Sequence, residues 1–290
     1  MWPDGKKFGI CLSHDVDRVE KQWWHCITHF LKEKRIYHIK TLLTRWRDNP
    51  YWNFEKIMEI EERYNVRSTF FFLNESKKLK FLDTSTYPLA LGNYDINKKE
   101  IVEIIKELDK NGWEIGVHGS YDSYLSANML KKEKAVLENI VGHKIIGIRQ
   151  HYLNLKIPET WIYQRKAGFK YDASFGFRRD IGFRENKILP FSPFEDNFLV
   201  IPLTIMDSAL FHQYPYMKDA WNSVLKIIKF AEKNSALITV LWHQRVFNEK
   251  EFPRWSKMYE KIIQEGIKRR AWFGRCVDVW EVCKNECRDN

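Results

Sequence analysis

Short apolar runs alternate with amphipathic stretches along nearly the whole chain. The runs predict strands, at 8–13, 67–73, 113–117, 145–148, 169–172, 198–202 and 237–242. Between the runs, apolar residues recur at helical spacing, as at Ile101, Ile104, Ile105 and Leu108. Alternation of this kind favours parallel strands joined by right-handed helical crossovers.

Residues that begin and end helices mark the helical stretches. Ser126 is a suitable N-cap, Pro158 fits a first helical turn, and Gly112, Gly142 and Gly168 follow predicted helix ends. Helices are therefore predicted at about 52–65, 98–111, 127–142, 158–168 and 218–234, and from about 253, and a strand–helix pair is predicted at 271–287.

These elements predict an α/β fold, an irregular (β/α) barrel with about seven parallel strands. An open doubly wound sheet is less favoured, because no glycine-rich phosphate loop follows the first strand. No linker divides the 290 residues, so 1–290 is predicted to be a single domain. The irregular stretch 174–197 is long for a loop and indicates a lid or insertion.

Residues that suit catalysis or metal binding come directly after four of the predicted strands. They are Asp15 and Asp17, then His118, then Arg149 and His151, and finally His243. The carboxyl ends of parallel strands meet at one rim, where such folds place their active sites. The pattern therefore predicts an enzyme.

The chemistry of these side chains indicates how they divide the work. Two carboxylates as close as Asp15 and Asp17 suit one metal ligand and one general base. His118 with a carboxylate is a common zinc set, and His243 is a natural general acid. Arg149 is expected to fix a neighbouring carboxylate and lower its pKa through a bidentate pair.

Composition narrows the possible partners. The formal net charge is +10, from 48 basic and 38 acidic residues, which suits nucleic acid, anionic glycans or an anionic membrane. Nucleic acid is the weakest of these, because no zinc-finger, helix-turn-helix or RNA-recognition signature is present. No uncharged run approaches the roughly 18 residues that span a bilayer. No secretory signal is recognisable either, so a cytoplasmic location is expected.

The segment 21–47 is unusually basic and aromatic, and predicts a helical insertion at about 20–50. The favoured interpretation is a helix that covers the barrel flank with its basic face in solvent. The alternative is peripheral contact with the inner face of an anionic membrane. Within this segment, His25 and His29 have a spacing that can bind metal, but a solvent-facing pair is favoured.

Five short motifs, in order along the chain, resemble those of the NodB-homology polysaccharide deacetylases. Asp15-Val16-Asp17 resembles the first motif of that family, and Arg149-Gln150-His151 its arginine motif. The remaining three are Ser68-Thr-Phe-Phe-Phe72, His118-Gly-Ser-Tyr-Asp122 and Leu241-Trp-His243. Arg149 to Tyr152 is similar to a subgroup that is often associated with surface-polysaccharide synthesis.

The resemblance implies a metal-dependent hydrolase, with zinc as the expected metal, that removes an N-acetyl group from a sugar or glycan precursor. Asp17 and His118 would hold the metal, and Asp15 would deprotonate its bound water. His243 would protonate the leaving amine, and Arg149 would orient Asp15.

One departure from the family pattern leaves the third metal ligand open. Asp122 stands where many members have a second histidine, so either Asp122 or His151 supplies the ligand, and His151 is favoured because it ends a strand. Tyr152, Trp242 and Asp172 are predicted substrate contacts, with Asp172 alternatively orienting His243 or capping a loop. A catalytically impaired glycan-binding protein and a hydrolase of another small amide are the alternative functions.

Overall fold

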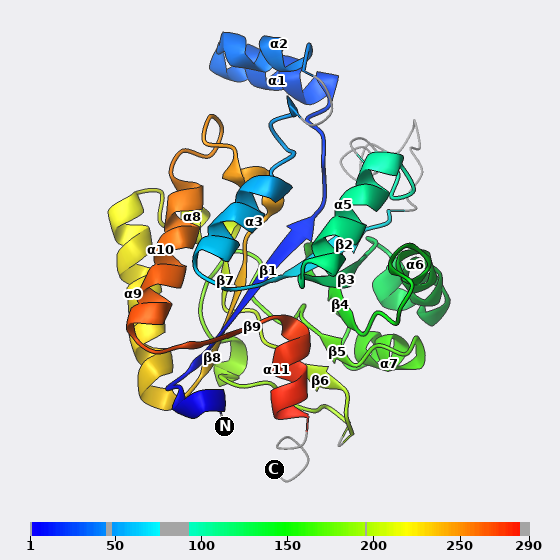
Figure 1. Cartoon of the computed structure of the whole chain (residues 1–290), viewed down its shortest axis with the longest axis vertical. Helices are drawn as coiled ribbons and strands as arrows, with labels where there is room; N and C mark the ends of the chain where they lie inside the picture. The colour runs from blue at the N-terminus through cyan, green and yellow to red at the C-terminus, as the bar shows by residue number, and fades with distance from the viewer. Residues whose placement is uncertain (1, 45–47, 76–92, 195, 285–290) are drawn as a thin grey trace.

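The computed structural model describes residues 2–44, 48–75, 93–194 and 196–284, and its centre is a nine-stranded sheet whose ladders are all parallel (Figure 1). The strands are β1 (Gly9–Val16), β2 (Thr69–Leu73), β3 (Glu114–Gly119), β4 (Gly147–Gln150), β5 (Tyr171–Asp172), β6 (Leu199–Val200), β7 (Ile205–Met206), β8 (Leu237–Leu241) and β9 (Trp272–Gly274). They run in the order β6-β5-β4-β3-β2-β1-β8-β7, and β9 also pairs with β1.

The stretch 199–206 contains β6 and β7, the strands at the two ends of this order, and so curls the sheet into a distorted barrel. At its start, the Leu199 and Ile201 amides donate to carbonyls beside and within β5, at 2.9 and 2.8 Å. At its end, the Thr204 amide donates to Thr239 of β8 at 3.0 Å, and β7 continues that pairing. The predicted irregular barrel is thus confirmed. Its additional strand, β7, was not predicted.

Helices surround the sheet at positions close to those predicted. They are α1 (Trp23–Glu33), α2 (Ile36–Thr41), α3 (Phe54–Arg63), α5 (Lys99–Lys110), α6 (Ala127–Val141), α7 (Glu159–Lys166), α8 (Asp207–Gln213), α9 (Met217–Asn234), α10 (Trp255–Lys268) and α11 (Cys276–Cys283). The capping signals hold for α6, where the Ser126 hydroxyl accepts from the Met129 amide and Gly142 is left-handed at φ 82°.

The insertion at 20–50 forms α1 and α2, but it does not cover the barrel flank. Figure 1 shows both helices beyond the carboxyl end of β1, at the opposite end of the molecule from α11. Large apolar side chains on them are exposed, among them Trp23, Leu31 and Ile36. The favoured interpretation of this segment was therefore wrong in its placement.

Aromatic side chains of β2 form much of the core on the outer side of the sheet. Phe72 is fully buried and stacks on Phe54 of α3, with ring centroids 6.1 Å apart. We expect Phe72→Ala to lower the free energy of unfolding by about 3–5 kcal/mol, because it leaves a cavity there. Tyr216→Ala, at an exposed position, should change it by no more than about 0.5 kcal/mol. Urea unfolding of both variants is the measurement, and equal effects would contradict this view of the core.

Candidate active site and metal position

The carboxyl ends of the strands open into a cavity of about 610 Å³. Five of the strand-end residues predicted to share a rim line it, namely Asp15, Asp17, His118, His151 and His243. Arg149 lies beneath them and is fully buried. The structure therefore brings together the set that the sequence predicted from strand ends alone.

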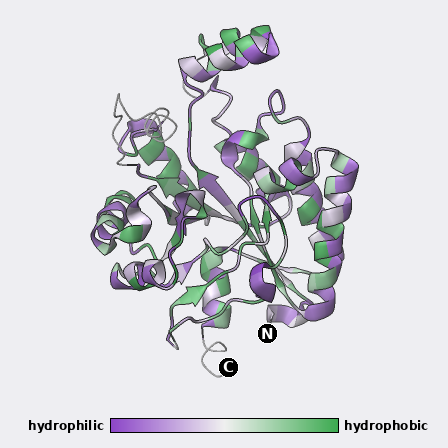
Figure 2. Cartoon of the chain, turned by 180° about the vertical axis from the view of Figure 1, so that it is seen from behind, coloured by the Kyte–Doolittle hydropathy of each residue, from purple (hydrophilic) through white to green (hydrophobic). Residues whose placement is uncertain are grey.

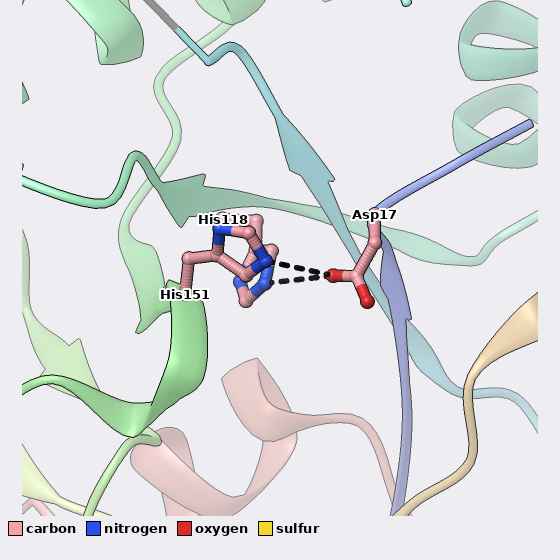
Figure 3. Close-up of side chains that lie close together, drawn as sticks. All are labelled: Asp17, His118 and His151. Atoms are coloured by element: carbon pink, nitrogen blue, oxygen red, sulfur yellow. Dashed lines mark ion pairs between the residues drawn. The ribbon is translucent and has the colours of Figure 1, made fainter. Parts of the chain in front are cut away.

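Asp17, His118 and His151 converge on one point (Figure 3). The Nε2 atom of His118 lies 3.2 Å from Asp17 Oδ1, and the Nε2 atom of His151 lies 3.8 Å from the same oxygen. One ligand atom from each of the three residues lies within 4.8 Å of the other two. Figure 3 shows that both imidazoles point toward the carboxylate.

The donor atoms of this cluster fit a divalent metal. The Nδ1 atom of His118 is 2.9 Å from the Arg149 carbonyl, so it carries the proton and leaves the Nε2 lone pair facing Asp17. Asp17 Oδ1 is buried and has no hydrogen-bond partner among the described residues. Two imidazoles and one carboxylate form a common three-residue set in catalytic zinc sites, which keep a further position open.

Positive charge around Asp17 keeps it ionised. Burial alone would raise the pKa of Asp17, but nearby positive charge, led by that of His243 and including that of Arg245, outweighs burial and holds the pKa well below its usual range. An ionised carboxylate with a free buried oxygen is ready to bind a cation.

Asp15 is held by Arg149 through one hydrogen bond. Arg149 Nη1 donates to Asp15 Oδ1 at 2.8 Å, while its Nε donates to the Ala173 carbonyl at 2.9 Å. Within the described residues, Arg149 therefore does not form the expected bidentate pair with Asp15. Its guanidinium divides its donors between the Asp15 carboxylate and the Ala173 carbonyl. The other oxygen of Asp15, Oδ2, lies 3.8 Å from His118 Nε2, next to the metal cluster.

His243 is positioned by Asp207, a residue that the sequence analysis missed. Both carboxylate oxygens of Asp207 lie near His243 Nδ1, at 2.9 and 3.0 Å, so Nε2 is turned toward Asp17 Oδ2 at 3.5 Å. Burial lowers the pKa of His243, but Asp207 and Asp17 outweigh it and raise the pKa to about 9. His243 is thus protonated near neutral pH, as a general acid requires.

Removal of the Asp207 charge should weaken this acid. We expect Asp207→Asn to lower kcat at least about tenfold, in line with losses seen when groups that orient catalytic residues are replaced. The acid form of His243 is lost as pH rises through its pKa. Its lower pKa in the variant should therefore shift the alkaline limb of the kcat–pH profile to lower pH. A reduced kcat with an unmoved alkaline limb would contradict this role.

Three predicted site residues do not reach the cavity. Asp122 belongs neither to the cavity lining nor to the metal cluster, so His151 occupies the position of the third ligand. Asp172 is fully buried and accepts hydrogen bonds from Ser174, Gln164 and Trp161, which is the loop-capping alternative. Trp242 is fully buried in the core. Neither Asp172 nor Trp242 is part of the cavity lining, so the structure does not place these two predicted substrate contacts at the cavity.

The remaining lining gives the cavity a cationic wall. Four arginines contribute to it, namely Arg18, Arg178, Arg179 and Arg245. Burial and the nearby charge of Arg245 lower the pKa of Arg18. Burial and the charge of Arg18 lower the pKa of His25 to about 3. Tyr152 lines the same cavity, as predicted for a substrate contact.

A second group of possible ligands, His29, Glu33 and His38, suits a metal less well. Lys21 Nζ lies 2.8 Å from His38 Nδ1, and an ammonium can only donate, so this nitrogen accepts. The Nε2 atom of His38 then carries the proton and donates to Glu33 at 3.0 Å. No lone pair of His38 is left for a cation.

Comparisons with known proteins identify the fold. No family model matches the chain, and no curated protein matches it. Among solved structures, a candidate polysaccharide deacetylase from Mycobacterium smegmatis superposes with a TM-score of 0.65 at 16% identity, over 99% of this chain and 93% of that one. A second such protein, from Pseudomonas aeruginosa PAO1, has a TM-score of 0.65 at 15% identity, over 99% and 94%. The chain shares the fold of polysaccharide deacetylases.

Other solved structures with this fold differ in activity. PuuE allantoinase superposes with a TM-score of 0.65 at 14% identity, over 99% of this chain and 93% of that one. BA3943, a CE4 family pseudoenzyme from Bacillus anthracis, superposes with a TM-score of 0.50 at 12% identity, over 95% and 66%. At such identities the similarity establishes the fold alone. The activity has to be argued from the cavity itself.

Proposed function

We propose that the protein is a metal-dependent hydrolase that removes an N-acetyl group from a sugar or glycan precursor. The observation that carries this proposal is the cluster of Asp17, His118 and His151 with a base and an acid beside it. Asp15 lies 3.8 Å from the cluster, measured to His118 Nε2, and His243 lies 3.5 Å from it, measured to Asp17 Oδ2. The resemblance in sequence motifs and the shared fold support the same chemistry.

The residues divide the hydrolysis into two proton transfers. A divalent metal, zinc by preference, would act as a Lewis acid that lowers the pKa of water and polarises the acyl oxygen. Asp15 takes a proton from the attacking water, and the hydrogen bond from Arg149 fixes its carboxylate. His243 gives a proton from Nε2 to the sugar nitrogen as the amide bond breaks, so acetate and a free amine leave.

The cationic wall favours a substrate that carries phosphate, such as a nucleotide-linked or lipid-linked sugar. Guanidinium groups bind phosphate oxygens through paired hydrogen bonds. Arg178 and Arg179 come from the long irregular segment 174–197, which supports its predicted role as a lid or insertion over the cavity.

The same fold occurs in proteins with two other functions. The fold is also found in an allantoinase, so hydrolysis of a small amide is an alternative. It is also found in a pseudoenzyme, so glycan binding without cleavage is another. An active enzyme is favoured over a glycan-binding pseudoenzyme, because one cavity holds the complete set of Asp15, Asp17, His118, His151 and His243.

Acetate release from a panel of substrates tests the proposal. Free N-acetylglucosamine, uridine-diphosphate N-acetylglucosamine, an N-acetyl chitooligosaccharide and allantoin would be compared, with allantoate followed for the last. We expect acetate from at least one N-acetyl sugar, with the phosphorylated one hydrolysed best. Turnover of allantoin alone would replace the proposal with the small-amide alternative, and inactivity on a panel extended to lipid-linked sugars would favour a glycan-binding protein.

A further inference from the structure

The outer surface of α1 and α2 is apolar to an extent found nowhere else in the described residues. On α1, Trp23 is 65% exposed and Leu31 is 59% exposed, with Ile27 between them. On α2 and the residues after it, the exposed apolar side chains are Ile36, Ile39, Leu42 and Leu43, and Leu43 is 87% exposed. We call these seven side chains the apolar face. Figure 2 shows hydrophobic and hydrophilic residues side by side on both helices.

The helical spacing explains why the three side chains on α1 share one direction. Trp23, Ile27 and Leu31 are separated by four residues each and so lie on one side of α1. His25 and His29 lie two residues from them, about 200° around a helix of 3.6 residues per turn. These two histidines line the catalytic cavity. One side of α1 therefore forms the cavity wall, and the opposite side is presented to the surroundings.

Polar contacts attach the two helices to the barrel. Lys21 Nζ donates to Glu251 at 2.7 Å, and the Tyr37 hydroxyl donates to the same carboxylate oxygen at 3.3 Å. Asn248 donates to the Tyr37 hydroxyl at 2.9 Å. The apolar face is thus fixed in its orientation relative to the cavity.

The charged residues beside the apolar face indicate which kind of surface it would bind. Lys32, Lys34, Arg35 and Lys40 are exposed around it, and Glu33 is the one acidic residue among the exposed residues described between 23 and 44. Amphipathic helices with exposed tryptophan and leucine next to lysine and arginine bind at the interface of anionic bilayers. A second copy of this chain would bring equal positive charges together, which opposes self-association through this face.

We propose that α1 and α2 form an interfacial anchor that docks the protein on the surface of an anionic lipid bilayer. The apolar face enters the boundary between headgroups and acyl chains, and the four basic side chains meet lipid phosphates. None of the helices in the described part of the chain has an apolar stretch of the length that a membrane span requires. Docking holds the cavity beside the bilayer, because the same helix α1 lines it.

Vesicle flotation with the full chain tests the anchor without any substrate, so its outcome is independent of the proposed hydrolysis. Vesicles of phosphatidylcholine with phosphatidylglycerol would be compared with vesicles of phosphatidylcholine alone. The double variant Leu31→Ser/Leu43→Ser removes two apolar contacts, and Tyr216→Ser/Ile267→Ser changes two exposed apolar side chains elsewhere as the matched control. Thermal unfolding would show that both variants remain folded.

We expect the wild type and the control variant to float with the anionic vesicles. The Leu31→Ser/Leu43→Ser variant should bind at least about tenfold more weakly, because each leucine side chain moves a large apolar area from water into the bilayer on binding. A second variant, Lys34→Gln/Arg35→Gln, should weaken binding to anionic vesicles several-fold. Failure of the wild type to float would overturn the proposal. So would equal binding by wild type and the Leu31→Ser/Leu43→Ser variant, or a wild-type dimer that this variant dissociates.

Discussion

Asp15→Asn is expected to lower kcat for acetate release by about 10²–10⁴-fold, the contribution usual for a general base. Asparagine keeps the size of the side chain and can still accept the hydrogen bond from Arg149, which is 2.8 Å in the wild type. It cannot take a proton from water, so the loss reports the chemistry of the base. Steady-state acetate release with saturating substrate is the measurement.

Asp122→Asn is the matched control for this experiment. Asp122 lies just after β3 and Asp15 lies near the carboxyl end of β1, but Asp122 is not part of the cavity lining. The same exchange of carboxylate for amide there should leave kcat within about twofold of the wild type, as expected for a group that takes no part in the reaction. More than a tenth of wild-type activity in Asp15→Asn would rule Asp15 out as the base.

The second large effect is on metal affinity. His118→Ala and His151→Ala should each weaken binding of Zn²⁺ by about 100-fold or more, because each removes one of three donors that converge within 4.8 Å. Asp122→Ala should bind as tightly as the wild type. Affinities measured by competition with a chromophoric chelator would distinguish the three variants, with thermal unfolding as the check on folding.

The outcome of this comparison decides between the two possible third ligands. Tight binding by His151→Ala together with weak binding by Asp122→Ala would make Asp122 the ligand. Unchanged affinity in both histidine variants would show that the cluster does not hold the metal.

The strand ends were predictable because two rules act together on them. Apolar runs place β1, β3 and β8, and parallel strands bring their carboxyl ends to one rim. Alternation along a strand then separates the two faces. Asp15 and Asp17 face the cavity while Val16 packs in the core, and His243 faces the cavity while Trp242 packs in the core. The same alternation could have excluded Trp242 as a substrate contact.

The residues that sequence analysis missed or misplaced lie where local geometry has no periodic signal. Asp207 follows a strand of two residues and begins a seven-residue helix, α8. The apolar run before it, Leu203-Thr-Ile-Met206, was not predicted as a strand of its own. Asp172 also ends a two-residue strand, but its carboxylate accepts hydrogen bonds from the amide and the hydroxyl of Ser174 and so caps the following loop. His151 was the favoured third ligand, although it reaches the metal position from a 3-10 turn in which Tyr152 has φ 57° and not from a strand. Such turns are not specified by side-chain pattern alone.

Removal and restoration of the metal tests the central claim most directly. The enzyme would be stripped with a chelator, dialysed and assayed for acetate release from an N-acetyl sugar that the untreated enzyme hydrolyses, with increasing Zn²⁺. We predict at least about 100-fold loss on stripping and recovery at about one Zn²⁺ per chain, because one three-residue site holds the metal. Full activity of the stripped protein, with no metal detected by mass spectrometry, would contradict metal-dependent deacetylation at Asp17, His118 and His151.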